Sequence, residues 1–173
     1  MLDVFAQAES GPRWLDQHSH PDLPSEAERA LRLAGLAWHR EEEAEAHLAR
    51  AAELAPGHLV VLVAHYRYHF YKHHYDRAEH FARQCLDRVA AELGIPGEFD
   101  AVNRDHADFT GENPLVRFWL FAMQAYGYVL LRLGDQARGI AVLEKVTLLD
   151  ASDNTKTRVL LQVIARAGTD DEN

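Results

Sequence analysis

The chain has 173 residues, 47% of them hydrophobic, and a net charge of −9; this composition is ordinary for one globular domain. An acidic chain repels phosphate backbones and anionic lipid headgroups, so we expect neither nucleic-acid binding nor docking on a membrane surface. Residues 1–10 lack a signal-peptide pattern, and the single cysteine, Cys85, cannot form an internal disulfide. These features predict a cytoplasmic protein.

The first half of the chain predicts four helices after an irregular leader over residues 1–24. Ser25 and Glu28 have the spacing of a helix capping box, so the first helix should begin at Ser25. A second helix should end near Leu54, because a Pro-Gly pair follows. The third and fourth helices are expected over 59–72 and 75–93, and Gly94 is a suitable left-handed cap for the fourth.

The second half predicts a loop over 95–114 and three further helices. An Asn-Pro pair at 113–114 is a strong helix start, and the apolar run over 115–133 should be buried on most sides. The sixth helix is expected over 140–149. A polar residue at position 152 or 153 should cap the last helix, over 153–168.

Small or apolar residues recur in this helical pattern with a period of 34 residues. Ala44, Leu48 and Ala51 are followed 34 positions later by Ala78, Ala82 and Cys85, and a third copy, formed by Gly139, Leu143 and Val146, follows 61 positions after the second. Such a period indicates stacked helical hairpins, in which small side chains let paired helices approach closely.

The pattern resembles the tetratricopeptide repeat. The matching positions are Leu31, Ala44, Leu48, Ala51 and Pro56 in the first unit, Leu62, Tyr75 and Ala78 in the second, and Gly127, Gly134 and Leu143 in the third. The resemblance implies an all-α, right-handed stack of about three hairpins with a C-terminal capping helix. The repeats would occupy about 25–58, 59–94 and 115–152, in a single domain over 25–168 that precedes a disordered tail over 169–173.

Members of that family usually hold another protein in a concave groove, and the resemblance implies the same role here. The family's groove positions correspond to Arg67, Phe70, Tyr71, Gln124, Tyr128 and Arg132. Aromatic rings beside arginines suit a peptide or partner protein that bears an acidic group. The competing interpretation is that some of these aromatic side chains pack against the leader or the final helix.

A histidine cluster gives an alternative function. His65, His69 and His73 follow one another at intervals of four residues, and two neutral imidazoles at this spacing can bind zinc or another transition metal. The competing interpretation places His65 and His69 in the core and His73 in a solvated turn.

No motif for nucleophilic catalysis, phosphate binding or dinucleotide binding occurs in the sequence. Cys85 occupies a small buried repeat position, where a thiol is usually inert. We therefore expect a non-catalytic adaptor without a cofactor, with metal binding as the alternative. A self-assembling homo-oligomer is a third class, because the apolar helix over 115–133 could pair with a second copy.

Overall fold

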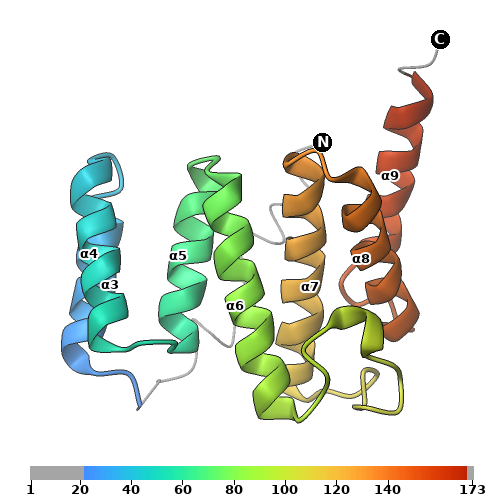
Figure 1. Ribbon diagram of the computed structural model, residues 1–173, viewed down its shortest axis with the longest axis horizontal. Helices are drawn as coiled ribbons and strands as arrows, with labels where there is room; N and C mark the ends of the chain where they lie inside the picture. Colours follow the sequence, from blue (N-terminus) through green and yellow to red (C-terminus); the bar gives the residue numbers. More distant parts are fainter. Residues whose placement is uncertain (1–21, 171–173) are drawn as a thin grey trace. The chain divides into compact units, whose positions relative to one another are not determined.

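The computed structural model describes residues 22–170 (Figure 1), and these residues form helices and no strand. The helices are α3 (Ser25–Leu36), α4 (Glu41–Leu54), α5 (Leu59–Tyr71), α6 (Tyr75–Leu93), the short 3-10 helix η1 (Phe99–Ala101), α7 (Pro114–Arg132), α8 (Gln136–Leu149) and α9 (Thr157–Asp170). The predicted all-α class is confirmed. Residues 1–21 of the predicted leader and residues 171–173 of the predicted tail lie outside the described residues.

The chain divides into two compact units, and the predicted single domain spans both of them. Gln17–Arg88 forms one unit, in which α3 packs on α4 and α4 packs on α5. Val89–Asn173 belongs to the other, in which α8 contacts α7, α9 and η1. The α3–α4 and α7–α8 pairs agree with the first and third predicted hairpins, and the right-handed repeat stack stays a prediction.

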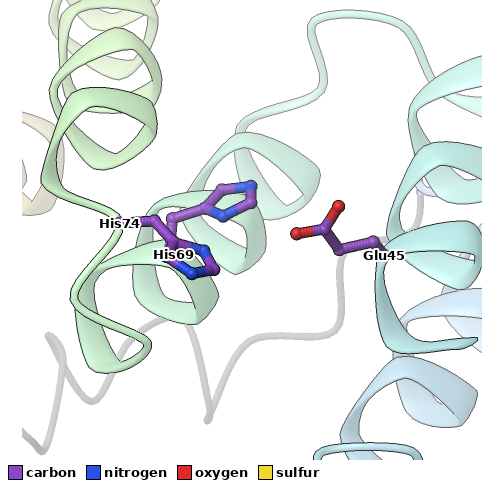
Figure 2. Close-up of side chains that lie close together, drawn as sticks. All are labelled: Glu45, His69 and His74. Atoms are coloured by element: carbon purple, nitrogen blue, oxygen red, sulfur yellow. The ribbon is translucent and has the colours of Figure 1, made fainter. Parts of the chain in front are cut away.

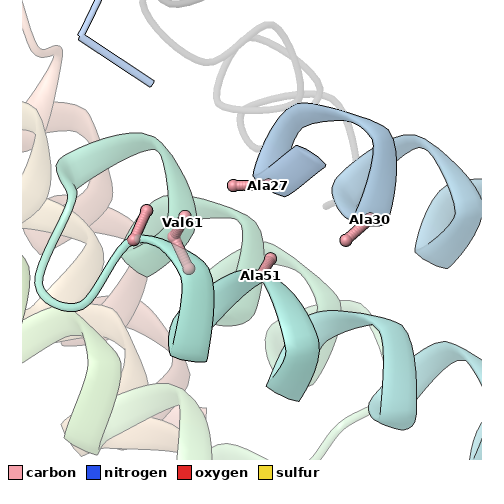
Figure 3. Close-up of a cluster of buried hydrophobic side chains, with 5 residues drawn as sticks. Ala27, Ala30, Ala51 and Val61 are labelled. Atoms are coloured by element: carbon pink, nitrogen blue, oxygen red, sulfur yellow. The ribbon is translucent and has the colours of Figure 1, made fainter. Parts of the chain in front are cut away.

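Small side chains form the core of the first compact unit, Gln17–Arg88. Ala27 and Ala30 of α3 face Ala51 of α4 and Val61 of α5 (Figure 3), and all four are buried. A second cluster joins the same helices through Ala34, Ala37, Ala44, Leu48 and Tyr68. Because alanine adds only one carbon beyond the backbone, these contacts hold the helix axes close together.

Glycine has the same role between α7 and α8 in the second unit. A Cβ atom on Gly139 would lie 2.6 Å from Leu131 Cδ2 and 3.0 Å from the carbonyl oxygen of Gly127. A Cβ atom on Gly127 would lie 2.9 Å from Leu143 Cγ. The two glycines therefore permit an approach that any larger side chain would prevent.

The long loop between α6 and α7 packs onto the second unit. Its residues Val102 and Phe109 are buried, and the Phe109 ring lies 5.8 Å from that of Trp119. Arg104 donates to the carbonyl oxygen of Leu148 through Nε at 2.9 Å and through Nη2 at 2.6 Å. Because the last carbonyls of a helix lack intrahelical donors, Arg104 also caps α8.

The first helix begins at Ser25 as predicted, but the predicted capping box is not formed, because Pro24 occupies the N-cap position without a side-chain hydrogen bond. Two other predicted helices have wrong ends. The sixth helix begins at Gln136 because the Asp135 side chain caps it. The last helix begins only at Thr157 and reaches Asp170, beyond the predicted start of the tail.

The delay in α9 has a polar cause. Asp150 is buried, and its Oδ2 accepts hydrogen bonds from the amide and the hydroxyl of Thr155. These bonds hold the chain in a loop before the helix begins.

None of the helices in residues 22–170 combines the length and the apolar character that a membrane span needs.

We predict that Gly139→Ala lowers the free energy of unfolding by about 1–3 kcal/mol, because the added methyl group would crowd a backbone oxygen that cannot move aside. Urea denaturation followed by circular dichroism measures this change. Gly35→Ala is the matched control: nothing lies within 4 Å of its Cβ position, so helix propensity should raise stability by about 0.5 kcal/mol. Equal stability of the two variants would contradict the close approach of α7 and α8.

Candidate metal centre

The end of α5 brings together two histidines that are five positions apart. The amide of His74 donates to the carbonyl oxygen of His69 at 2.8 Å, and the amide of His73 donates to that of Phe70 at 3.0 Å. His73 has a φ of 60°, in the left-handed region. This pair of bonds is a Schellman motif, which reverses the chain and returns His74 to the last turn of the helix.

Glu45 of α4 faces these two histidines (Figure 2). Glu45, His69 and His74 each offer one ligand atom, and the three atoms lie within 4.8 Å of one another. Ligand atoms around a tetrahedral zinc ion are roughly 3.3 Å apart, given zinc–ligand distances of about 2.0–2.1 Å. Glu45 is partly exposed and can close most of that difference by side-chain rotation.

His69 is buried and packed on Phe81, whose ring lies 5.6 Å away and nearly parallel to it. Burial lowers the pKa of His69 from 6.5 to about 4; attraction to Glu45 opposes this shift, while repulsion from His65, Arg77 and His74 adds to it. The ring is therefore neutral at physiological pH, and a neutral imidazole is the form that binds metals.

His74 is oriented by a carboxylate. It directly precedes α6, and its Nε2 lies 3.3 Å from Glu41 Oε1. When the ring proton is on Nε2, it is donated in a hydrogen bond to Glu41. Nδ1 is then unprotonated, and its lone pair is available to a metal ion. Carboxylates often orient metal-binding histidines in this way.

Both histidines have a buried nitrogen that the fold does not satisfy. Nδ1 of His69 and Nδ1 of His74 are buried, and within residues 22–170 neither has a hydrogen-bond partner. Such unpaired polar atoms are unfavourable in a folded protein, and a bound ion or an ordered water is one way to satisfy them. Nδ1 of His65 is buried and without a partner in the same part of the chain. Glu45 does have a partner, because Arg77 Nη1 of α6 lies 2.7 Å from its Oε1.

The structure does not bring together the predicted metal set of His65, His69 and His73. His65 Nε2 lies 3.1 Å from the carbonyl oxygen of Leu48, and its ring stacks on Phe81 at 4.3 Å. That placement matches the competing interpretation of a core histidine. His73 is exposed, lies beyond the end of α5, and hydrogen-bonds to the Tyr75 hydroxyl through Nδ1 at 2.7 Å.

The predicted groove residues are divided between the two units. Arg67, Phe70 and Tyr71 lie on α5, where all three are partly buried and the Tyr71 ring is 6.3 Å from that of Trp38.

On α7, Gln124 donates to the carbonyl oxygen of Thr155 at 2.8 Å, and Arg132 donates to the Tyr128 hydroxyl at 3.3 Å. Gln124 thus holds the loop before α9. The groove as a whole stays a prediction.

Sequence reasoning missed Glu45 and His74 as members of the cluster. The interval of four residues directed attention to His73, although the chain leaves the helix at that point. His74 joins the cluster because His73 takes the left-handed position of a Schellman motif, which glycine normally occupies, so the sequence held no clear signal for it. Glu45 had no signal either, because its position opposite His69 depends on helix packing.

The chain is 35% identical over 150 residues to the uncharacterized 19.8 kDa protein in the nifW 5′ region of Azotobacter chroococcum mcd 1. The alignment covers 86% of this chain and 84% of that relative. The chain therefore belongs to the same family as that protein. No protein-family model and no solved structure matches the chain.

The depressed pKa of His69 predicts a loss of stability in acid. The unfolded chain binds a proton at this residue near pH 6.5, whereas the folded chain binds it only near pH 4. The unfolded state therefore holds more protons as pH falls through this window, and unfolding becomes easier. After allowance for solvent screening, we expect His69 to contribute a loss of about 1 kcal/mol between pH 7 and pH 5.

Urea titrations at both pH values in wild type and in His69→Leu test this prediction. The leucine variant should show a smaller pH dependence, and a part should remain because burial also lowers the pKa of His65. His39→Leu, a substitution of an exposed histidine, is the control for a general effect of removing one imidazole. An unchanged pH dependence in His69→Leu would refute the assignment.

Proposed function

We propose that the protein binds one transition-metal ion, of the zinc class, through Glu45, His69 and His74. The observation that carries this proposal is the cluster of three ligand atoms within 4.8 Å of one another, and the buried, unpartnered Nδ1 atoms of both histidines support it. Two imidazoles and one carboxylate suit Zn²⁺ and other first-row divalent ions better than Mg²⁺ or Ca²⁺, which prefer oxygen ligands.

Three protein ligands leave at least one coordination position of a tetrahedral ion for water or an external group. His69 and His74 would bind through nitrogen and Glu45 through oxygen, while Glu41 would hold the His74 ring in place. The side chains that surround the cluster do not by themselves indicate a substrate. We propose binding, without a catalytic step.

Titration calorimetry of the untagged, metal-free protein with Zn²⁺ tests the proposal. We predict one ion per chain, and an affinity loss of about tenfold or more on Glu45→Gln or His74→Gln, by analogy with the loss on removing even an orienting partner. Both substitutions are in partly exposed residues and should preserve the helical circular dichroism spectrum.

Two control variants separate the observed cluster from the predicted one. His47→Gln removes a histidine on the same helix as Glu45 and should leave the affinity unchanged. His73→Gly removes a residue of the predicted metal set and places glycine at a left-handed position, so it should preserve binding and stabilise the fold. Absence of Zn²⁺ binding in the wild type, or binding that only His73→Gly abolishes, would refute the proposal.

Protein binding is a second candidate function. Its supporting observation is Leu36 at the end of α3, which is 73% exposed and corresponds to a groove-lining position of the tetratricopeptide repeat. Large apolar side chains with this exposure are common in contact surfaces, although a single one is also found on ordinary surfaces. An adaptor role would use Leu36 together with Arg67, Phe70 and Tyr71 of the same unit.

A partner test distinguishes this function from metal binding. We predict that wild type captures a partner that Leu36→Glu combined with Arg67→Glu does not, while Glu45→Gln still captures it. Proteins from the source cell are the sample, and the product of nifW is one defined candidate, because the relative's gene lies in the 5′ region of nifW. Equal capture by all variants would contradict the predicted surface.

A further inference from the structure

We propose that Arg77 competes with the metal ion for Glu45: it holds the carboxylate in the metal-free protein and leaves it when an ion binds. This inference rests on the proposed function, because it concerns the same three ligands. It makes Arg77 a residue that determines which ions the cluster accepts, although Arg77 is not itself a ligand.

The first argument is the geometry of the ion pair. Arg77 Nη1 lies 2.7 Å from Glu45 Oε1 and joins α6 to α4 across 32 positions of sequence. A charge-assisted hydrogen bond of this length engages Oε1 and neutralises the carboxylate that a metal would need. Both partners remain partly exposed, at 53% for the Arg77 side chain and 34% for that of Glu45, so the guanidinium can move into solvent without leaving a buried charge.

The second argument is the charge around the cluster. The Arg77 guanidinium pairs with Glu45, one of the three proposed ligands, so its positive charge lies beside the cluster. The same charge opposes a divalent cation at that place more strongly than it opposes a proton. Glu41 Oε1 lies 3.3 Å from His74 Nε2 and supplies an opposing negative charge.

This arrangement favours ions that bind nitrogen strongly. While Arg77 neutralises the charge of Glu45, the two imidazoles are the groups of the cluster that still attract a metal ion. Zn²⁺, Co²⁺, Ni²⁺ and Cu²⁺ gain most from imidazole, whereas Mg²⁺ and Ca²⁺ depend on free carboxylates. Arg77 therefore excludes the abundant hard cations.

Calorimetric titration with Zn²⁺ and with Mg²⁺ in wild type, Arg77→Met, Arg77→Lys and Arg50→Met tests the proposal. We expect Arg77→Met to bind Zn²⁺ about threefold to tenfold more tightly, since a partly exposed ion pair contributes modestly and one repelling charge is removed. Arg77→Lys keeps the charge and should behave like wild type. Arg50→Met breaks the Arg50–Glu53 pair on α4, 2.9 Å long, and controls for the loss of an ion pair outside the cluster.

A second readout reports the movement of Arg77 itself. Nuclear magnetic resonance of the arginine Nε–H groups should show the Arg77 signal moving toward that of a solvated arginine when Zn²⁺ is added to wild type, with the Arg50 signal unchanged. A residue that only supports the fold would show neither this change nor tighter binding after substitution.

The outcomes separate this inference from the proposed function. If wild type binds Zn²⁺ and Arg77→Met binds it equally or more weakly, Arg77 orients Glu45 and the competition is refuted while the proposed function stands. If neither protein binds Zn²⁺, both are refuted. Binding by Arg77→Met alone would support the competition and refute metal binding by the native chain.

Discussion

The close packing of α3, α4 and α5 at alanine positions is the constraint on which the candidate site depends. Ala44 and Tyr68 belong to one buried cluster, and the residues that follow them in sequence are Glu45 and His69. Packing at Ala44 therefore sets the distance at which the carboxylate of one helix faces the imidazole of the next. A larger residue at position 44 would separate the helices and the two ligands together, so core and site cannot vary independently.

Burial of α5 has a second consequence, which is chemical. The helix carries His65 and His69 in its buried face, and both stack on Phe81. His65 gains a hydrogen bond to the carbonyl oxygen of Leu48, so it joins α5 to α4 as a structural residue. His69 has the same aromatic support, and Nδ1 of both rings lacks a partner within the described residues, so the two histidines differ in the Nε2 hydrogen bond that His65 makes. Two histidines one turn apart thus have different roles, because only one of them reaches a backbone acceptor.

Local signals accounted for most helix positions, and tertiary contacts accounted for what local signals missed. The starts and ends near Leu54, Gly94 and Asn113 follow from proline, glycine and capping residues, whose effects act within a few positions. The left-handed turn at His73 was not predicted because glycine normally occupies that place, as Gly94 and Gly134 do at the ends of α6 and α7. The late start of α9 depends on the buried Asp150–Thr155 hydrogen bonds, and the position of Glu45 depends on packing between helices. Neither the late start of α9 nor the position of Glu45 leaves a pattern in a single sequence.

The two candidate functions involve the same helix, and this connects them physically. Arg67, Phe70 and Tyr71 lie in the last turns of α5, while His69 lies among them and His74 follows the turn. An ion bound by Glu45, His69 and His74 would link α4 to both sides of that turn and stabilise it against local opening. At a free ion concentration of about 100 times the dissociation constant, this stabilisation is about 2.7 kcal/mol. A partner that recognises the ordered end of α5 would then bind the metal-loaded protein better, and by thermodynamic linkage it would strengthen metal binding by the same factor.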